Sequence, residues 1–379
     1  MNYVMLKDVC AINMGQSPDS NSYNDNGEGV PFFQGNADFG ERYPVTRKWC
    51  SAPTKMAAPE DILISVRAPI GALNYAKEEC CIGRGLAALT PDKSKVSSEF
   101  IFWLLKSKNE ELNNKGTGST FKAIGRKDLE ETMVPDISLD KQLQYSDALE
   151  RVYGIIHARK QELQKLDDLI KARFVEMFGD PIANPMGWIE TTIGDECFYI
   201  KDGPHKSLPD IGKENGGHPF ISVRNIVNGY IDFSSARYIS DEDYADAIKK
   251  CHPEKGDMLY SKGGTTGIAK LIDIDEEFAN WVHVAVLKFE KTKLNGIFFE
   301  NMLNGDYCYE QSQRLTKGIA NRDLVLSAMA QIKMYRPPME LQEQFADFVH
   351  QVDKSKVAVQ ASLDQAQILF DSLMQKYFG

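Results

Sequence analysis

The sequence predicts an α+β protein in which two mixed α/β domains are separated by two long helices, packed as an antiparallel coiled coil with pseudo-two-fold symmetry. Two observations carry this prediction. Apolar residues recur at steps of three and four through residues 139–180, which is the period of helices that pack side by side. The pattern returns 200 residues later, in residues 339–379. The chain therefore divides into a domain (1–138), a helix (139–180), a second domain (181–338) and a second helix (339–379).

Each long segment has the features of one uninterrupted helix. No proline occurs between Lys141 and Asp180, and at ~1.5 Å per residue about forty residues make a rod of roughly 60 Å. Both copies end on Phe-Gly, at residues 178–179 and 378–379. We expect the helices to pair through the apolar seam residues Leu149, Val152, Ile156, Leu163, Leu166 and Ile170 of the first and Val349, Val352, Val359, Leu363, Phe370 and Leu373 of the second.

The two domains also resemble each other. Residues 6–10 match 193–197, residues 61–65 match 257–261, and residues 125–129 match 320–324. The offset drifts from 187 to 200 along the chain, which predicts small insertions in the loops of the second copy. In the first domain we expect strands at 4–12, 29–34, 61–66 and 82–89, and a helix at 97–109 that begins on a serine cap.

Composition is that of an ordinary soluble protein, with 42% hydrophobic and 26% charged residues among 379. There is no run of about 18 apolar residues and no signal-peptide pattern at the N-terminus, so we expect a cytoplasmic protein without membrane contact. The net charge is −10, and the four segments carry −2, −1, −4 and −3. Any contact with nucleic acid must therefore come from local basic clusters.

The seven cysteines are an odd number without a CxxC pair, which indicates reduced thiols. Cys251 and His252 could form half of a metal site, but no second half stands at a suitable spacing, so we expect no metal. The chain also lacks GxxxxGK[ST], HExxH and GxSxG. At Asp180-Pro181-Ile182 the second proline and the aromatic of an amino-methyltransferase tetrapeptide are missing. We therefore expect a binding protein with no catalytic residues and no cofactor of its own.

The strongest binding candidates are polar or glycine-rich loops with isolated positive charge, which recur at matching places in both domains. Glycine lets the backbone approach a phosphate closely, hydroxyl groups donate to phosphates or base edges, and lysine or arginine neutralises phosphate or reads guanine. An ordinary solvated turn is the alternative for any one loop. The candidate DNA-binding residues are Gln34, Asn36, Arg67, Lys115, Thr117, Ser119, Thr120, Lys122, Arg126, Arg224, Asn225, Lys262, Gly263, Gly264, Thr265, Thr266, Lys270, Lys317, Asn321 and Arg322.

Three stretches carry a family resemblance. LQKLDDLIKARFVEMFGDPIANPMGW (163–188), GTGSTFKAIGRKDL (116–129) and LTKGIANRDL (315–324) resemble the central helix, its exit and the closing segments of the recognition domains in specificity subunits of type I restriction-modification systems. The resemblance covers the whole chain in its order of domain, helix, domain and helix. The recognition domains vary freely in this family, so the resemblance does not transfer a DNA target.

The resemblance implies that each domain is a target-recognition domain that reads one half of a split double-stranded DNA sequence. The paired helices would set the spacer between the halves and dock two methyltransferase subunits, which bind S-adenosylmethionine and methylate a flipped adenine. Restriction and translocase subunits would join for cleavage. Two alternatives stay open: a specificity subunit of a modification-only adenine methyltransferase, and a coiled-coil scaffold that binds only protein. A fused restriction-methyltransferase enzyme is disfavoured because the methyltransferase tetrapeptide is missing.

Overall fold

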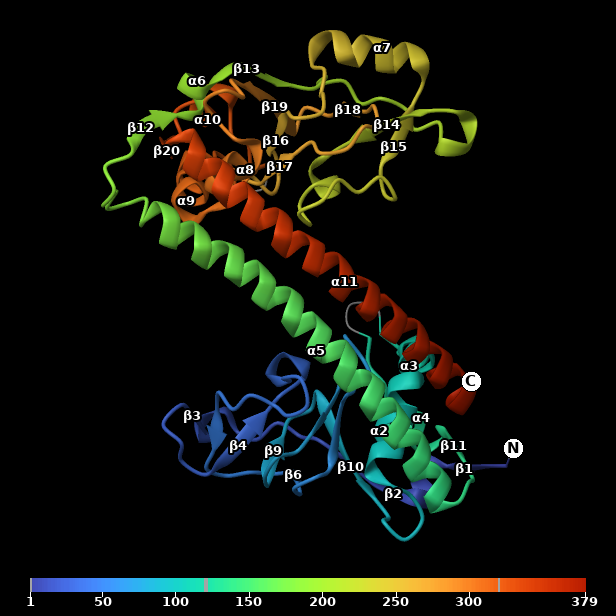
Figure 1. Cartoon of the computed structure of the whole chain (residues 1–379). Helices are drawn as coiled ribbons and strands as arrows, with labels where there is room; N and C mark the ends of the chain where they lie inside the picture. Colours follow the sequence, from blue (N-terminus) through green and yellow to red (C-terminus); the bar gives the residue numbers. More distant parts are fainter. Residues whose placement is uncertain (1, 119–121, 320) are drawn as a thin grey trace. The chain divides into compact units, whose positions relative to one another are not determined.

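The computed structural model describes residues 2–118, 122–319 and 321–379, which form two compact units. Unit 1 consists of residues 1–160 and 360–379, and unit 2 of residues 161–359. The division passes through both long helices, α5 (Leu139–Phe178) and α11 (Met339–Phe378), so each unit contains part of each (Figure 1). Within these described ranges, no helix combines the length and apolar character needed to cross a membrane.

Unit 1 is built on two sheets. The first is antiparallel, with the order β2-β10-β7-β8, and the second has the order β3-β5-β4-β9-β6, in which β4 and β9 run parallel. A separate pair joins β1 to β11. The strands are β1 (Tyr3–Met5), β2 (Cys10–Met14), β3 (Tyr23–Asn24), β4 (Val30–Phe33), β5 (Trp49–Cys50), β6 (Met56–Ala57), β7 (Ile62–Ser65), β8 (Leu73–Tyr75), β9 (Cys80–Ile82), β10 (Leu86–Pro91) and β11 (Met133–Pro135).

One helix of unit 1, α2 (Ser98–Ser107), packs against the first half of α5 (Figure 1). It begins where the Ser97 hydroxyl accepts a hydrogen bond from the Phe100 N–H at 3.1 Å. The indole of Trp103, which is fully buried, donates to Glu150 of α5 at 3.1 Å. The other helical segments are α1 (Leu6–Val9), η1 (Ser20–Ser22), η2 (Asn36–Asp38), α3 (Asn109–Lys115) and α4 (Arg126–Glu130).

Within unit 1 the two long helices run in opposite directions. The ring of Tyr145 stacks on that of Tyr377, with centroids 3.9 Å apart, and the Arg159 Nε donates to the Ser362 hydroxyl at 3.2 Å. Of the expected seam residues in this unit, Leu149, Val152, Ile156 and Phe370 are buried and Leu363 and Leu373 are partly buried in the same core.

Unit 2 repeats this plan. Its antiparallel sheet has the order β13-β19-β16-β17, and its second sheet, β15-β14-β18, again contains one parallel pair, β14 with β18. The pair β12 with β20 corresponds to β1 with β11. The strands are β12 (Ile189–Thr192), β13 (Cys197–Asp202), β14 (His218–Ile221), β15 (Arg237–Ile239), β16 (Met258–Ser261), β17 (Ala269–Leu271), β18 (Ala279–Asn280), β19 (Val284–Phe289) and β20 (Lys333–Arg336).

The core of unit 2 also includes the long helices. Phe174 of α5 meets Phe345 of α11 edge-on at 5.3 Å, and Lys356 pairs with Asp167 at 2.7 Å, so the helices are again antiparallel. The seam residues Ile170, Val349, Val352 and Val359 are buried, while Leu163 and Leu166 are half-buried. The other helical segments are α6 (Ile193–Glu196), η3 (Lys213–Asn215), η4 (Val223–Asn225), α7 (Asp241–Lys250), α8 (Gly296–Asn304), α9 (Asp306–Leu315) and α10 (Leu326–Met329).

Two of the expected strands were wrong in detail. The run 4–12 is interrupted by α1, because Leu6 and Val9 lie one turn apart and both enter the core. The run 82–89 consists of the end of β9 and most of β10, separated by Gly83-Arg84-Gly85. The larger insertion in unit 2 is α7, which packs on the sheet β15-β14-β18 and follows β15 where unit 1 continues into the short strand β6 (Figure 1).

The expected match of residues 125–129 with 320–324 was also wrong. The Ile124 N–H donates to Val66 O in unit 1, and the Leu324 N–H donates to Lys262 O in unit 2. Leu324 therefore corresponds to Ile124, and Asp323 corresponds to Ala123. The sequence match aligned the two Asp-Leu pairs, but the backbone places the second pair before α10, whereas the first lies inside α4.

Candidate nucleic-acid interface

Backbone hydrogen bonds bring several separate segments of unit 1 to one edge of its sheets. The Gly83 N–H donates to Phe33 O at 2.8 Å, and the Val66 N–H donates to Gly85 O at 2.9 Å. The Ile124 N–H donates to Val66 O, also at 2.9 Å. We call the joined segments, residues 34–38, 66–70, 83–85, 117–118 and 122–124, the loop edge of unit 1.

Unit 2 has the same arrangement. The Trp281 N–H donates to Ile221 O at 2.9 Å, the Lys262 N–H to His283 O at 2.8 Å, and the Leu324 N–H to Lys262 O at 2.7 Å. The loop edge of unit 2 thus comprises residues 222–225, 262–266, 281–283, 317–319 and 321–323. Because each bond has a counterpart in unit 1, the two loop edges are equivalent surfaces.

One turn shows how closely the two edges agree. After β7 the Ser65 hydroxyl accepts from the Ala72 N–H at 2.9 Å, and after β16 the Ser261 hydroxyl accepts from the Ile268 N–H at 2.8 Å. Gly71 and Gly267 take positive φ angles of 86° and 90° in these turns, a backbone conformation that favours glycine. The sequence therefore builds the same turn twice, with different side chains on it.

About half of the candidate residues are exposed on the loop edges. On unit 1 these are Gln34, Arg67, Thr117 and Lys122, with Asn36 half-exposed. On unit 2 they are Arg224, Gly264, Thr265, Lys317 and Asn321, with Arg322 half-exposed and bonded to Gln313. Ser119 and Thr120 lie outside the described residues.

Two further candidates in unit 1 are paired with acids on their own helices. Lys115 ends α3 and bonds Glu111 at 2.7 Å, and Arg126 begins α4 with Glu130 at 3.5 Å. Both pairs are at least partly exposed to solvent, so each contributes little to stability and can open at small cost. Neither pair prevents a contact with phosphate.

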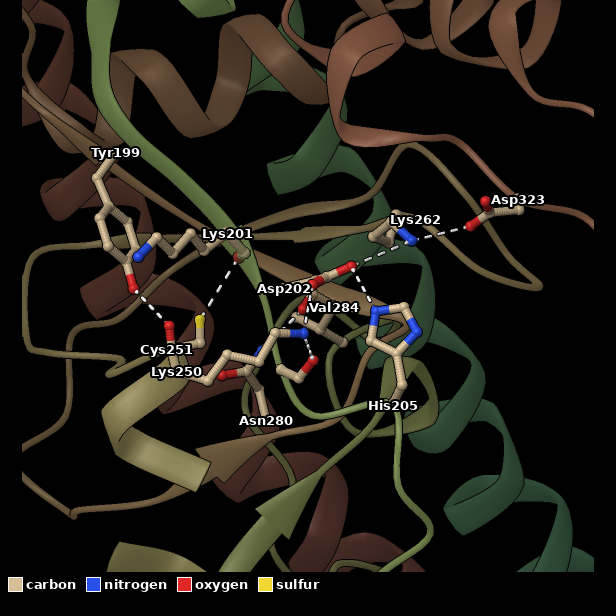
Figure 2. A network of polar contacts seen from close by, with 11 residues as sticks. Tyr199, Lys201, Asp202, His205, Lys250, Cys251, Lys262, Asn280, Val284 and Asp323 are labelled. Carbon is tan, nitrogen blue, oxygen red and sulfur yellow. Dashed lines mark hydrogen bonds and ion pairs between the residues drawn. The ribbon is translucent and has the colours of Figure 1, made fainter. Parts of the chain in front are cut away.

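The prediction that Lys262 contacts DNA is not supported by its environment. Its side chain is only 6% exposed, and its ammonium lies 2.9 Å from Asp323 and 3.6 Å from Asp202 (Figure 2). Asp202 is also bonded by Lys250 at 2.9 Å. A buried charge is stable only when it is paired. The Lys262 ammonium therefore belongs to an ion-pair cluster inside unit 2 and does not lie on the surface that could face DNA.

Four other candidates in unit 2 have interior roles for similar reasons. Lys270 is 9% exposed and pairs with Glu300, whose own burial raises the pKa of its carboxyl. The buried Thr266 shares a hydrogen bond with Thr316 at 2.9 Å. Asn225 is 1% exposed and closes the η4 turn by accepting from the Ser222 N–H at 2.8 Å. Gly263 is glycine because a Cβ there would meet the His283 ring.

Several exposed cations on or beside the loop edges were missed by the sequence reasoning. Arg84 stands exposed between Gly83 and Gly85. Lys48 and Arg237 lie at equivalent places on β-strand partners, since Phe32 N–H donates to Lys48 O and Phe220 pairs with Arg237. Arg47 precedes Lys48 and is exposed as well. For Arg84, the Gly-Arg-Gly motif could have indicated an exposed binding residue. The positions of the other cations depend on strand pairing, which a single sequence does not reveal.

Each loop edge also contains a pocket at the end of the parallel strand pair. In unit 1 a pocket of about 430 Å³ is lined by Phe32, Gln34, Asn36 and Asp38, together with Arg47 and Lys48. In unit 2 a pocket of about 180 Å³ is lined by Phe220, Ser222, Arg224, Arg237 and Trp281. Because Phe32 corresponds to Phe220 and Lys48 to Arg237, these pockets occupy the same place in the two units.

A carboxylate lies close to the pocket of unit 2. Asp210 accepts from the backbone N–H groups of Tyr238 at 3.0 Å and Gly212 at 3.1 Å. These bonds, and then the nearby charges of Arg237 and Arg224, lower the pKa of Asp210, so it is ionised at neutral pH. The arrangement is thus two guanidinium groups beside one fixed acceptor.

The chemistry of the loop edges is that of polar recognition. Exposed amide, hydroxyl, guanidinium and ammonium groups can bind phosphate oxygens and base edges. Among the residues that the structure describes, no group of three or more His, Cys, Asp and Glu side chains could hold a metal ion.

Comparison with known proteins identifies the family. A family model for the type I restriction modification DNA specificity domain matches residues 1–167 and again 185–366. A specificity subunit assigned to the MjaX type I restriction enzyme of Methanocaldococcus jannaschii is 43% identical over 41% of this chain and 37% of its own length, so the match spans little more than a third of that relative. The MjaIX type I restriction enzyme specificity subunit of the same organism is 24% identical over 83% of this chain and 76% of its own.

A solved structure has the same fold along the whole chain. The S subunit of a type I restriction-modification system from M. genitalium superposes with a TM-score of 0.61, covering 100% of this chain and 96% of that one at 16% identity. The two family-model matches span most of the sequence and coincide with the structural repeat. The chain therefore belongs to the type I restriction-modification DNA specificity family.

Proposed function

We propose that this chain reads a bipartite double-stranded DNA target, one half with the loop edge of each unit. The observation that carries the proposal is the repetition of the loop edge, bond for bond, with different exposed side chains in the two units. The same scaffold presenting different donors and acceptors is what reading two different half-sites requires. Exposed cations on each edge supply the local positive charge that a chain of net charge −10 needs for binding phosphate.

We further propose that α5 and α11 form an antiparallel coiled coil that relates the units by a pseudo-two-fold axis and sets the spacer between half-sites. The antiparallel contacts found inside each unit support this arrangement. The chain is not itself catalytic and binds no cofactor. Two methyltransferase subunits, carrying S-adenosylmethionine, dock on the helices and modify an adenine in each half-site, and restriction and translocase subunits join where the system cleaves DNA.

The test is to co-express the chain with methyltransferase subunits of a type I system that assemble with it, and to map methylated adenines in the host by single-molecule sequencing. A split motif with a fixed spacer is expected. One heptad inserted after Leu163, with a matching heptad after Val359, should change the spacer or abolish methylation while each half-site motif stays the same. Methylation without a fixed spacer, or an unchanged spacer in the insertion variant, would contradict the proposal that the paired helices set the spacer.

A modification-only system predicts the same methylation pattern without cleavage of unmodified DNA, which a plasmid restriction assay decides. A scaffold that binds only protein predicts that the assembled complex has the same low affinity for every DNA sequence. Filter binding of the complex with target and scrambled duplexes separates that case from specific recognition.

A further inference from the structure

The pocket of unit 2 presents more hydrogen-bond donors than the protein itself uses. Arg224 donates one N–H to Ser235 O at 2.6 Å, which fixes the side chain and leaves the remaining N–H groups of its guanidinium. The Arg237 guanidinium carbon lies 5.9 Å from the centroid of the Trp281 ring. These remaining N–H groups of Arg224 can therefore donate to a ligand that accepts hydrogen bonds.

The walls of this pocket favour a flat ligand over a phosphate group. Phe220 and Trp281 contribute aromatic rings to a space of only about 180 Å³. The ionised Asp210 beside the two arginines would repel a second anion, whereas it tolerates a neutral base edge. The base whose major-groove edge offers two adjacent acceptors, and no donor, is guanine, through O6 and N7. Arginine is the residue that binds this pair of acceptors with a two-pronged geometry.

We propose that Arg224 and Arg237 form a guanine-reading pocket, and that they select a guanine within the half-site recognised by unit 2. This assignment rests on the proposed function, because it presumes that the loop edge faces DNA. Arg237 supplies the two-pronged contact, Arg224 is held in place by Ser235, and Trp281 supports the guanidinium of Arg237 through its ring.

The equivalent pocket of unit 1 provides an internal comparison. There Gln34 takes the place of Ser222, and Asn36 stands two residues further on, as Arg224 does in unit 2, while Lys48 takes the place of Arg237. A side-chain amide carries both an NH₂ donor group and a carbonyl acceptor, so it is not selective for a pair of acceptors. The unit 1 pocket therefore does not share the guanine preference, and a change there should leave the unit 2 half-site untouched.

The experiment uses the complex with its methyltransferase subunits and duplexes built on the motif that methylation mapping gives for the wild type. Arg237→Ala and Arg224→Ala should each reduce discrimination at one guanine position of one half-site by about 10- to 100-fold, and the other positions should keep theirs. Arg237→Lys keeps the charge but loses the planar fork, so overall affinity should be nearly preserved while the guanine preference falls. Lys48→Ala is the matched control and should affect only the other half-site.

Three outcomes would overturn the assignment. Equal loss of affinity at every base position, together with a weaker salt dependence, would identify the arginines as phosphate contacts. Unchanged discrimination in Arg237→Ala and Arg237→Lys would remove the pocket from recognition. A relaxed position that is not guanine would show that the pocket reads another base. If the wild-type complex itself shows no sequence preference, the proposed function fails instead, and the thermal unfolding midpoint of each variant shows whether it is folded.

Discussion

Lys262 occupies in unit 2 the place that Val66 occupies in unit 1. Each donates its N–H to the loop that follows the parallel strand pair, at 2.8 and 2.9 Å. Each also accepts from the N–H of a residue two positions before a helix, Leu324 before α10 and Ile124 before α4. The two acids around Lys262 have apolar counterparts as well. Asp323 corresponds to Ala123. Asp202 pairs with Ala285 in the sheet of unit 2, as Met14 pairs with Ala87 in that of unit 1, so Asp202 corresponds to Met14. One unit thus holds a charged cluster where the other holds a hydrophobic one.

The difference between the charged cluster of unit 2 and the apolar residues at the same places in unit 1 predicts how two variants of unit 2 differ in unfolding free energy. Lys262→Ala should destabilise unit 2 by about 1–3 kcal/mol, less than the roughly 3–5 kcal/mol typical of a broken buried pair, because Asp202 keeps Lys250 as a partner. The combined change Lys262→Val, Asp202→Met and Asp323→Ala installs the unit 1 set and should stay within about 1 kcal/mol of wild type. Urea unfolding measures both. A triple variant much less stable than Lys262→Ala would show that the cluster is required.

The buried position of Lys262 could not be predicted from the sequence. Lys262 follows a strand and precedes two glycines, a pattern typical of a ligand-binding loop, and its partners lie 60 and 61 residues away along the chain. Nothing local indicates that the ammonium turns inward. The burial of Lys270 on Glu300 was hidden in the same way.

Features encoded by local periodicity were predictable. The heptad pattern indicated helices at 139–180 and 339–379, and α5 and α11 occupy Leu139–Phe178 and Met339–Phe378. The pockets were not predictable, because Lys48 reaches Phe32, and Arg237 reaches Phe220, only through strand pairing. The four-residue helix α1 was hidden inside an apolar run that also suits a strand.

Phosphate contacts on the loop edge of unit 1 should show in the salt dependence of DNA binding by the assembled complex. Arg84→Ala and Lys122→Ala each remove one exposed cation, so each should reduce the slope of log K against log salt by about 0.9. Lys93 is the matched control: it is an exposed cation beyond the opposite end of β10 and pairs with Glu60. Fluorescence anisotropy at several salt concentrations gives the slopes, and equal slopes for Arg84→Ala and Lys93→Ala would exclude the contact.

The packing of α11 in unit 1 predicts a large difference between two neighbouring positions. Phe370 is 7% exposed, and its ring meets Trp103 edge-on at 5.5 Å, whereas Leu369 is 50% exposed. Phe370→Ala should therefore cost about 3–5 kcal/mol of unfolding free energy, and Leu369→Ala less than about 1 kcal/mol. Differential scanning calorimetry compares them. If Leu369→Ala leaves stability intact but weakens co-purification of the methyltransferase subunits, the exposed face of the helix is a docking surface.

Thiol chemistry provides a test of the cores of both units. All seven cysteines are buried, and burial raises the pKa of Cys10, Cys80, Cys197 and Cys308 to about 12. Only the thiolate attacks an alkylating reagent, so near neutral pH these groups should react about 1000-fold more slowly than in the unfolded chain, even before shielding by the fold is counted. Because the folded pKa lies far above the pH, the labelling rate should rise about tenfold per pH unit between 7 and 9. Mass spectrometry after timed alkylation, with and without urea, resolves the individual sites. Rapid labelling of Cys10 or Cys197 in the native protein would mean that the core beside β2 or β13 opens readily, in conflict with the burial of both thiols.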